Sequence, residues 1–234
     1  MMNIIKLFFA AIMVSFAANA NSALFDFTDD YWQSNTSMTL GGLTASVTAY
    51  NSNGSLTNYS SGQGFDGTND SYCLSLSLAC EIDGLGVGDD EITYSSSGNF
   101  NSAERIRVTF SETVNINFAL FLDLFAAGAN GSDPLTESAK ATGDTNNGNL
   151  VWDGIALDNT GWFMATETNR SHGSGTLLGI SYAEFFTKNA NATSNSDFAL
   201  AALDVSAVVP EPSIIALFGA GILGLGFARR RKLR

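Results

Sequence analysis

The sequence predicts an all-β domain, an antiparallel β-sandwich or jelly roll, from alternating apolar residues and frequent turn-forming linkers. The clearest alternation covers residues 114–125, where the even positions from 114 to 124 are apolar and the opposite face begins with Asn115 and Asn117. A period of two is typical of a strand with one buried face. Residues 105–110 alternate in the same way, with Arg105 and Arg107 facing outward. The short break at 111–113 therefore predicts a hairpin.

The other expected strands are separated by linkers rich in Gly, Asn, Ser, Thr and Asp, residues that suit turns. Gly41 and Gly42 predict a tight hairpin turn, because glycine adopts positive φ without steric cost. Residues 183–188 have a helical turn as their alternative. The expected strands are 38–40, 43–50, 150–157, 162–166, 177–186 and 198–208. The 234 residues suit one domain, 21–208, with a short segment at each end.

The N-terminal segment 1–20 has the pattern of an export signal. Lys6 precedes an apolar run over 7–16, and Ala18 and Ala20 supply the small residues that signal peptidase recognises. The run is shorter than the roughly 20 apolar residues that span a bilayer. We therefore expect the general secretion machinery to export the chain, and signal peptidase to cut after Ala20, with Ala23 as the alternative.

Charge is distributed unevenly. Residues 21–208 carry 22 of the 23 acidic residues and only 5 of the 11 basic residues, a net charge of −17. Such a domain repels nucleic acid and attracts cations. The sequence therefore predicts no nucleic-acid partner.

The two cysteines, Cys73 and Cys80, both lie in the part expected to be exported, where oxidation is the default. An even count with one short spacing predicts a single disulfide. Zinc would need further ligands, and His172 is the only histidine of the chain.

Three features follow one another in residues 209–234. Pro210 and Pro212 hold an extended backbone around Glu211, because each proline fixes φ and lacks a donor. Residues 214–228 carry no charge and predict a helix of about 22 Å, short of the roughly 30 Å hydrocarbon core. The basic cluster that follows should stay in the cytoplasm; it comprises Arg229, Arg230, Arg231, Lys232 and Arg234.

This order of motif, apolar helix and arginine cluster resembles the PEP-CTERM sorting signal, with Val209, Pro210, Glu211, Pro212 and Ser213 as its motif. The resemblance implies export by a Gram-negative bacterium. It implies processing near the motif by an exosortase, a membrane enzyme with a catalytic cysteine. It also implies an association with extracellular polysaccharide and biofilm matrix. The expected location is the inner membrane at first, with the domain outside, and then the outer surface or matrix.

Residues 84–92 are similar to a stretch found in some ectodomains of this kind, which assigns no chemistry. No catalytic residue is predicted. His172 lacks a nucleophile elbow, the cysteines are expected to be paired, and a carboxylate dyad is not identifiable among so many acids.

No cofactor is predicted, with calcium as a minor hypothesis. Carboxylates cluster at Asp89, Asp90 and Glu91, and again at Asp66 and Asp70, and calcium takes six to eight oxygen ligands. Neither cluster has the spacing of an EF-hand loop. Solvated acidic turns are the alternative explanation.

The sequence favours a non-catalytic protein of the cell envelope or extracellular matrix. The alternative is an exported carbohydrate-binding module, with or without calcium, and a secreted hydrolase is the third hypothesis. A groove lined by exposed aromatic residues would favour the second hypothesis. Trp32, Trp152 and Trp162 are its candidate residues.

Overall fold

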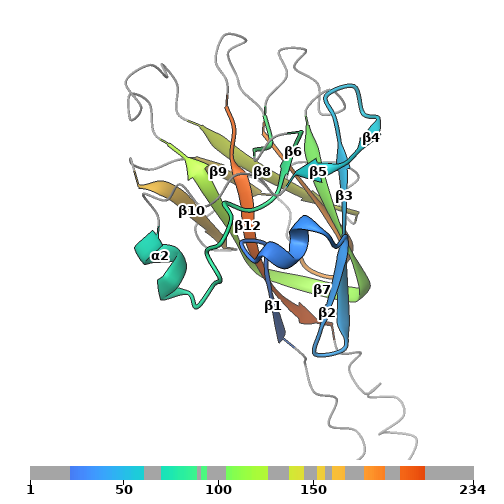
Figure 1. Ribbon diagram of the computed structural model, residues 1–234. Helices are drawn as coiled ribbons and strands as arrows, with labels where there is room; N and C mark the ends of the chain where they lie inside the picture. The colour runs from blue at the N-terminus through green and yellow to red at the C-terminus, as the bar shows by residue number, and fades with distance from the viewer. Residues whose placement is uncertain are drawn as a thin grey trace, which may run out of the picture. The chain divides into compact units, whose positions relative to one another are not determined.

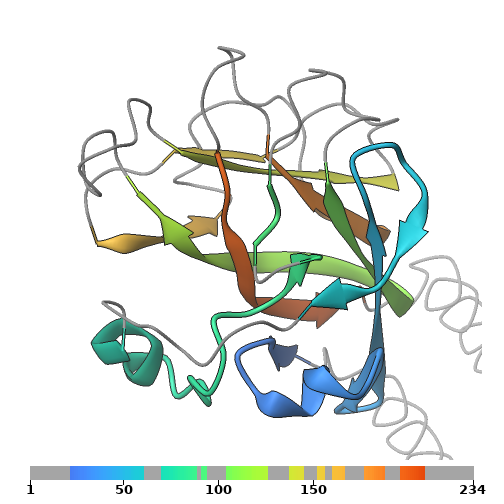
Figure 2. The ribbon, with the colours of Figure 1, turned by 45° about the horizontal axis from the view of Figure 1, so that its top comes forward.

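The computed structural model describes residues 22–60, 70–88, 91–93, 104–125, 137–144, 152–155, 160–166, 177–187 and 196–208. These residues are mostly β-strand, as predicted, and ten strands form one large antiparallel sheet (Figures 1 and 2). The elements are β1 (Ser22–Asp26), η1 (Asp30–Gln33), β2 (Ser37–Leu40), β3 (Leu43–Tyr50), β4 (Leu56–Thr57), β5 (Tyr59–Ser60), α2 (Asp70–Ser75), β6 (Gly86–Val87), β7 (Arg105–Leu124), β8 (Ser138–Gly143), β9 (Trp152–Ile155), β10 (Gly161–Thr166), β11 (Ile180–Phe186) and β12 (Ala199–Ala207).

Strand β7 is the centre of the sheet. Its first half pairs with β3 on one side and β11 on the other, and its second half pairs with β12 and β10. Strand β12 also pairs with β1, and β11 pairs with β8, which pairs with β9. The sandwich or jelly-roll class stays a prediction, because β7 belongs to both groups of strands and joins them into one hydrogen-bonded sheet.

The hairpin predicted at 111–113 is wrong, because β7 continues through these residues as one strand of 20 residues. Against β11, the register passes from Thr109 directly to Val114, so the four residues between them have no partner there. Ser, Glu and Thr rarely adopt the positive φ values that a tight hairpin turn requires. The polar break therefore marks the point where β7 exchanges one pair of neighbours for the other.

The single buried face predicted for 114–124 is also wrong in its second half. Val114 and Ile116 lie in the main core, but so do Ala119 and Phe121, which have the opposite parity. The register against β12 shifts between Asp204 and Val205, and such a bulge moves the following side chains to the other face.

Both faces of this part of the sheet are covered. On the main-core side, the Phe121 ring lies 6.1 Å from that of Phe185 on β11 and 5.1 Å from that of Phe198. On the other side, a second cluster contains Leu120 and Leu122 together with Cys73 and Leu78. Burial on both faces explains why the apolar pattern of β7 becomes nearly continuous after residue 118.

Most of the remaining strand predictions are confirmed. The hairpin of β2 and β3 is confirmed, with φ values of 59° at Gly41 and 90° at Gly42. Strands β9 to β12 lie at the four later predicted segments. The helical alternative for 183–188 is wrong, because β11 runs to Phe186 and pairs on both edges. Strands β1 and β8 were not predicted individually, and β8 consists largely of small and polar residues without alternation.

The described residues of the 84–92 stretch contact β12 and the residue before it at Gly84, Leu85 and Ile92. Leu85 and Leu200 exchange backbone hydrogen bonds of 3.0 and 3.1 Å, and the Ile92 amide donates to the Phe198 carbonyl. Gly84 has a φ of 131°, and a Cβ there would lie 2.6 Å from the Leu200 carbonyl oxygen. The glycine therefore allows a close backbone approach, which is a structural role.

Candidate functional site

A disulfide joins Cys73 of α2 to Cys80, as predicted. Cys73 is fully buried in the second core cluster, which also contains residues of β7 and β12. The bridge therefore closes a short loop, and the burial of Cys73 in this cluster packs the loop against the sheet.

Hydrogen bonds tie the same segment to the turn that follows β1. The Asp26 carboxylate accepts from the Thr28 amide at 2.9 Å, from the Thr28 hydroxyl at 2.6 Å and from the Ala79 amide at 2.6 Å. The Cys80 amide donates to the Thr28 hydroxyl oxygen at 2.9 Å. The amides of Glu81 and Ile82 both donate to the Thr28 carbonyl. These hydrogen bonds therefore fix the position of the disulfide loop relative to the end of β1.

We expect both thiols to be protected from alkylation in unreduced mature protein, measured by mass spectrometry. Replacing Cys73 and Cys80 together with serine should lower the free energy of unfolding by about 2 kcal/mol, because a short loop constrains the unfolded chain modestly. The matched control replaces Ser75 and Ser77, which lie inside the same loop, with alanine. Two alkylated thiols in the unreduced protein would contradict the expectation.

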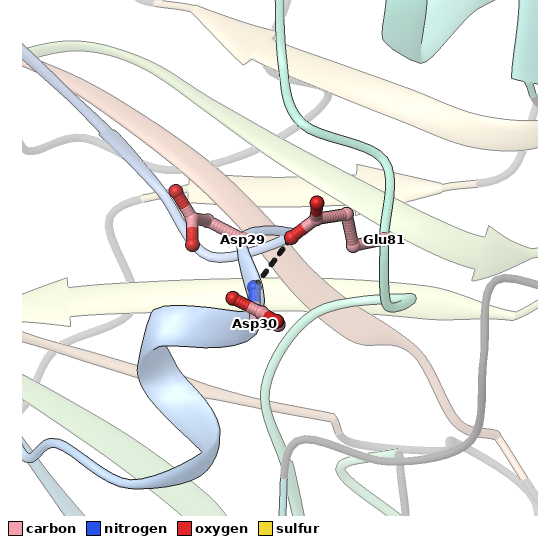
Figure 3. A group of neighbouring side chains, drawn as sticks. All are labelled: Asp29, Asp30 and Glu81. Carbon is pink, nitrogen blue, oxygen red and sulfur yellow. Dashed lines mark hydrogen bonds between the residues drawn. The ribbon is translucent and has the colours of Figure 1, made fainter.

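The disulfide loop and the turn after β1 together bring three carboxylates close to one another at the surface. Oxygen atoms of Asp29, Asp30 and Glu81 lie within 4.8 Å of one another (Figure 3). Asp29 is half-buried, and the other two are exposed. Sequence reasoning missed this cluster, because Glu81 lies 51 residues from Asp30. The only signal was that Glu81 directly follows a bridged cysteine.

Two of these carboxylates already have backbone partners. Asp29 caps η1 by accepting from the Tyr31 amide at 2.8 Å, and Glu81 accepts from the Asp30 amide at 3.1 Å. Three carboxylates offer hard oxygen ligands of the type calcium prefers, but fewer groups than the six to eight oxygens of a full site. The arrangement is therefore explained as helix capping at a surface turn.

The acidic clusters named from the sequence lie largely outside the part of the chain that the structure describes. Asp66, Asp89 and Asp90 lie outside the described residues, as does His172.

The tryptophans do not form an exposed binding platform. Trp32 and Trp152 are buried in the main core, and the indole Nε1 of Trp32 donates to the Asp26 carbonyl at 2.7 Å. Trp162 is half-buried against the second core cluster. The aromatic groove that would have favoured carbohydrate binding is therefore not built from these three residues.

A hollow of about 560 Å³ lies instead beside β3, and we call it the polar hollow. It is lined by residues 33–36 at the end of η1, by 47–49 of β3, and by 57–59 of β4 and β5. Tyr59 in its wall donates its hydroxyl hydrogen bond to the backbone carbonyls of Trp32 and Asn35. Burial, with a smaller contribution from Tyr31, raises the pKa of Tyr59 above its ordinary value. The hydroxyl therefore remains a donor at neutral pH.

The comparisons with known proteins identify the C-terminal segment. Residues 208–232 match the family model described as the PEP-CTERM protein-sorting motif. The chain carries a PEP-CTERM sorting motif. The motif marks an exosortase substrate and implies an exported protein associated with the cell surface. Comparison with curated proteins found no match, and neither did comparison with solved structures.

The PEP-CTERM segment begins directly after the last strand, since β12 ends at Ala207. The predicted motif residues 209–213, the apolar stretch 214–228 and the basic cluster lie outside the described residues. Among the residues that the structure describes, no helix is long and apolar enough to cross a membrane.

Proposed function

We propose that this chain is a non-catalytic protein of the cell envelope or extracellular matrix. Its PEP-CTERM segment holds it temporarily at the inner membrane of a Gram-negative bacterium, and an exosortase then releases the β-domain. The match at residues 208–232 is the observation that carries this proposal. The acidic composition of residues 21–208 supports it, because a net charge of −17 keeps a released domain soluble and away from anionic lipid.

The ends of the domain fit this route. Strands β1 and β12 are antiparallel neighbours, and Ser22 is paired in register with Ser206. Ser22 and Ala207 therefore lie at the same end of one strand pair. The signal segment precedes this end of β1 in the sequence, and the sorting segment follows this end of β12.

The same strand pair favours one of the two expected signal-peptidase cuts. Ala23 lies within β1, is only 5% exposed and pairs with Val205. A cut after Ala23 would remove the first two residues of β1, whereas a cut after Ala20 leaves the strand complete. We therefore propose cleavage after Ala20.

Intact-mass measurement of the protein from its native cells tests the proposal. The expected mature chain begins at Asn21 and lacks Arg234. Deleting the host exosortase should restore the C-terminus to Arg234 without changing the N-terminus. A chain that retains Arg234 in wild-type cells would show a permanent anchor instead, and an N-terminus at Leu24 would overturn the cleavage site.

A further inference from the structure

We propose that the polar hollow is a binding site for a neutral saccharide. Its volume of about 560 Å³ falls within the range of small-ligand sites. The proposal concerns the folded domain alone, so it does not depend on how the C-terminus is processed.

The polar groups of the lining suit a ligand that carries many hydroxyl groups. The lining residues with carboxamide groups are Gln33, Asn35 and Asn58. Those with hydroxyl groups are Ser34, Thr36, Thr48, Thr57 and Tyr59. Carboxamides and hydroxyls both donate and accept hydrogen bonds. Sugar hydroxyls also donate and accept hydrogen bonds. They can therefore pair with the carboxamides and hydroxyls of the lining without leaving a charged group unpaired.

Several of these side chains are available to a ligand. Gln33, Thr57 and Asn58 are exposed and Thr48 is half-buried. Within the described part of the chain, none of these four side chains is engaged in a hydrogen bond, and all four residues belong to the lining of the hollow.

The lining also excludes other ligand classes. Among the described residues that line it, none is lysine, arginine or histidine, so an anion would meet no counter-charge from them, and the acidic domain around it would repel one. The part of the lining that the structure describes also contains no aspartate or glutamate, which disfavours a metal ion. Its aliphatic members are Val47 and Ala49, both buried in the main core, so an apolar ligand gains little contact.

An extended peptide is the remaining neutral class, and the edge of β3 does not suit it. Strand β2 pairs with β3 as far as Ser46, and β4 pairs from Ala49 onward. Only two residues lie between these partners, and the Val47 amide already donates to the Thr36 carbonyl at 2.8 Å. A strand-like peptide needs a longer row of available backbone groups. The hollow therefore offers side chains for recognition.

The walls are fixed in advance. The Tyr59 hydroxyl binds the backbone of 32–35, and the Asn35 side chain donates to the Tyr31 carbonyl at 2.8 Å. The bond between Val47 and Thr36 then ties the same loop to β3. A site held by hydrogen bonds between its walls loses little conformational entropy when it binds.

Titration calorimetry with the purified mature protein tests the proposal. The probes are cellohexaose, maltohexaose, isomaltohexaose, mannohexaose and xylohexaose, with an acidic hexamer from alginate as the charged counterpart. We expect at least one neutral hexamer to bind, and the acidic hexamer to bind at least tenfold more weakly. Absence of binding by all five neutral probes at millimolar concentration would overturn the proposal, as would preferential binding of the acidic one.

Conservative variants locate the site. Thr48→Val removes a hydroxyl but keeps the branched shape that suits a strand, and Asn58→Ala removes a carboxamide from an exposed position. Each should weaken binding about fivefold, the equivalent of one hydrogen bond. Thr113→Val, at an exposed position in the middle of β7, is the matched control and should leave affinity unchanged. Unaltered melting temperatures show that the variants are folded. Equal affinities for Thr48→Val, Asn58→Ala and wild type would place the ligand elsewhere and overturn the proposal.

Discussion

Replacing Pro210, Glu211 and Pro212 with alanine is expected to abolish release of the β-domain while leaving its export intact. The two prolines fix φ and remove backbone donors, so they keep the segment out of a helix. Alanine has the highest helix propensity. The substituted segment would therefore extend the predicted apolar helix over 214–228 and hide the motif from a protease. Intact mass should show a chain that still ends at Arg234 and remains in the membrane fraction.

The basic cluster provides the matched control for this experiment. Replacing residues 229–232 with glutamine leaves the motif unchanged but removes four of the five charges that keep the C-terminus in the cytoplasm. This variant should be retained and oriented less well before processing, but the molecules that insert correctly should still be cut. Normal release of the alanine variant would contradict the role assigned to the motif.

The sequence predicted the strands of this domain better than their connections. Alternation located most of the long strands, because period two depends only on which face is buried. It could not show that β7 passes through 111–113 without turning. A polar break looks the same whether the chain reverses or changes neighbours, and the neighbours β3 and β11 lie far away in the sequence.

The candidate sites divide in the same way. The Cys73–Cys80 bridge and the PEP-CTERM motif are local in the sequence, so spacing and order were sufficient to find them. The polar hollow is assembled from 33–36, 47–49 and 57–59, and the acidic cluster joins Glu81 to the turn after β1. No local pattern distinguishes such residues from ordinary surface loops. These residues come together only in the folded chain, through the positions of β3 and the disulfide loop.

Arg105 and Arg107 show why an outward-facing position need not be solvated. Both were predicted on the outer face of β7, yet Arg105 is 11% exposed and Arg107 is 32% exposed at the side chain. Glu184 on β11 is paired in register with Arg107, although it lies 77 residues away. Its Oε1 accepts from the Nε of Arg107 at 2.9 Å and from the Nη2 of Arg107 at 2.7 Å, and lies 3.4 Å from the Nε of Arg105.

Aromatic rings hold the two guanidinium groups in place beside Glu184. The Arg105 guanidinium lies 4.4 Å from the ring centroid of Tyr50, and that of Arg107 lies 4.3 Å from the centroid of Tyr182. The Glu184 side chain is only 6% exposed, so water cannot replace it when its charge is removed. Two partly desolvated cations would then face each other on neighbouring positions of one strand face.

Replacing Glu184 with glutamine should therefore lower the free energy of unfolding by about 3 kcal/mol, the low end of the range for breaking a buried ion pair. Urea unfolding of the mature protein measures this, with Glu112→Gln at an exposed position in the middle of β7 as a control expected to change stability by less than about 0.5 kcal/mol. Adding Arg107→Met to Glu184→Gln should recover part of the loss, because it removes one of the two uncompensated cations. A Glu184→Gln variant as stable as the Glu112→Gln control would show that the charge of Glu184 is not needed to stabilise this face of the sheet.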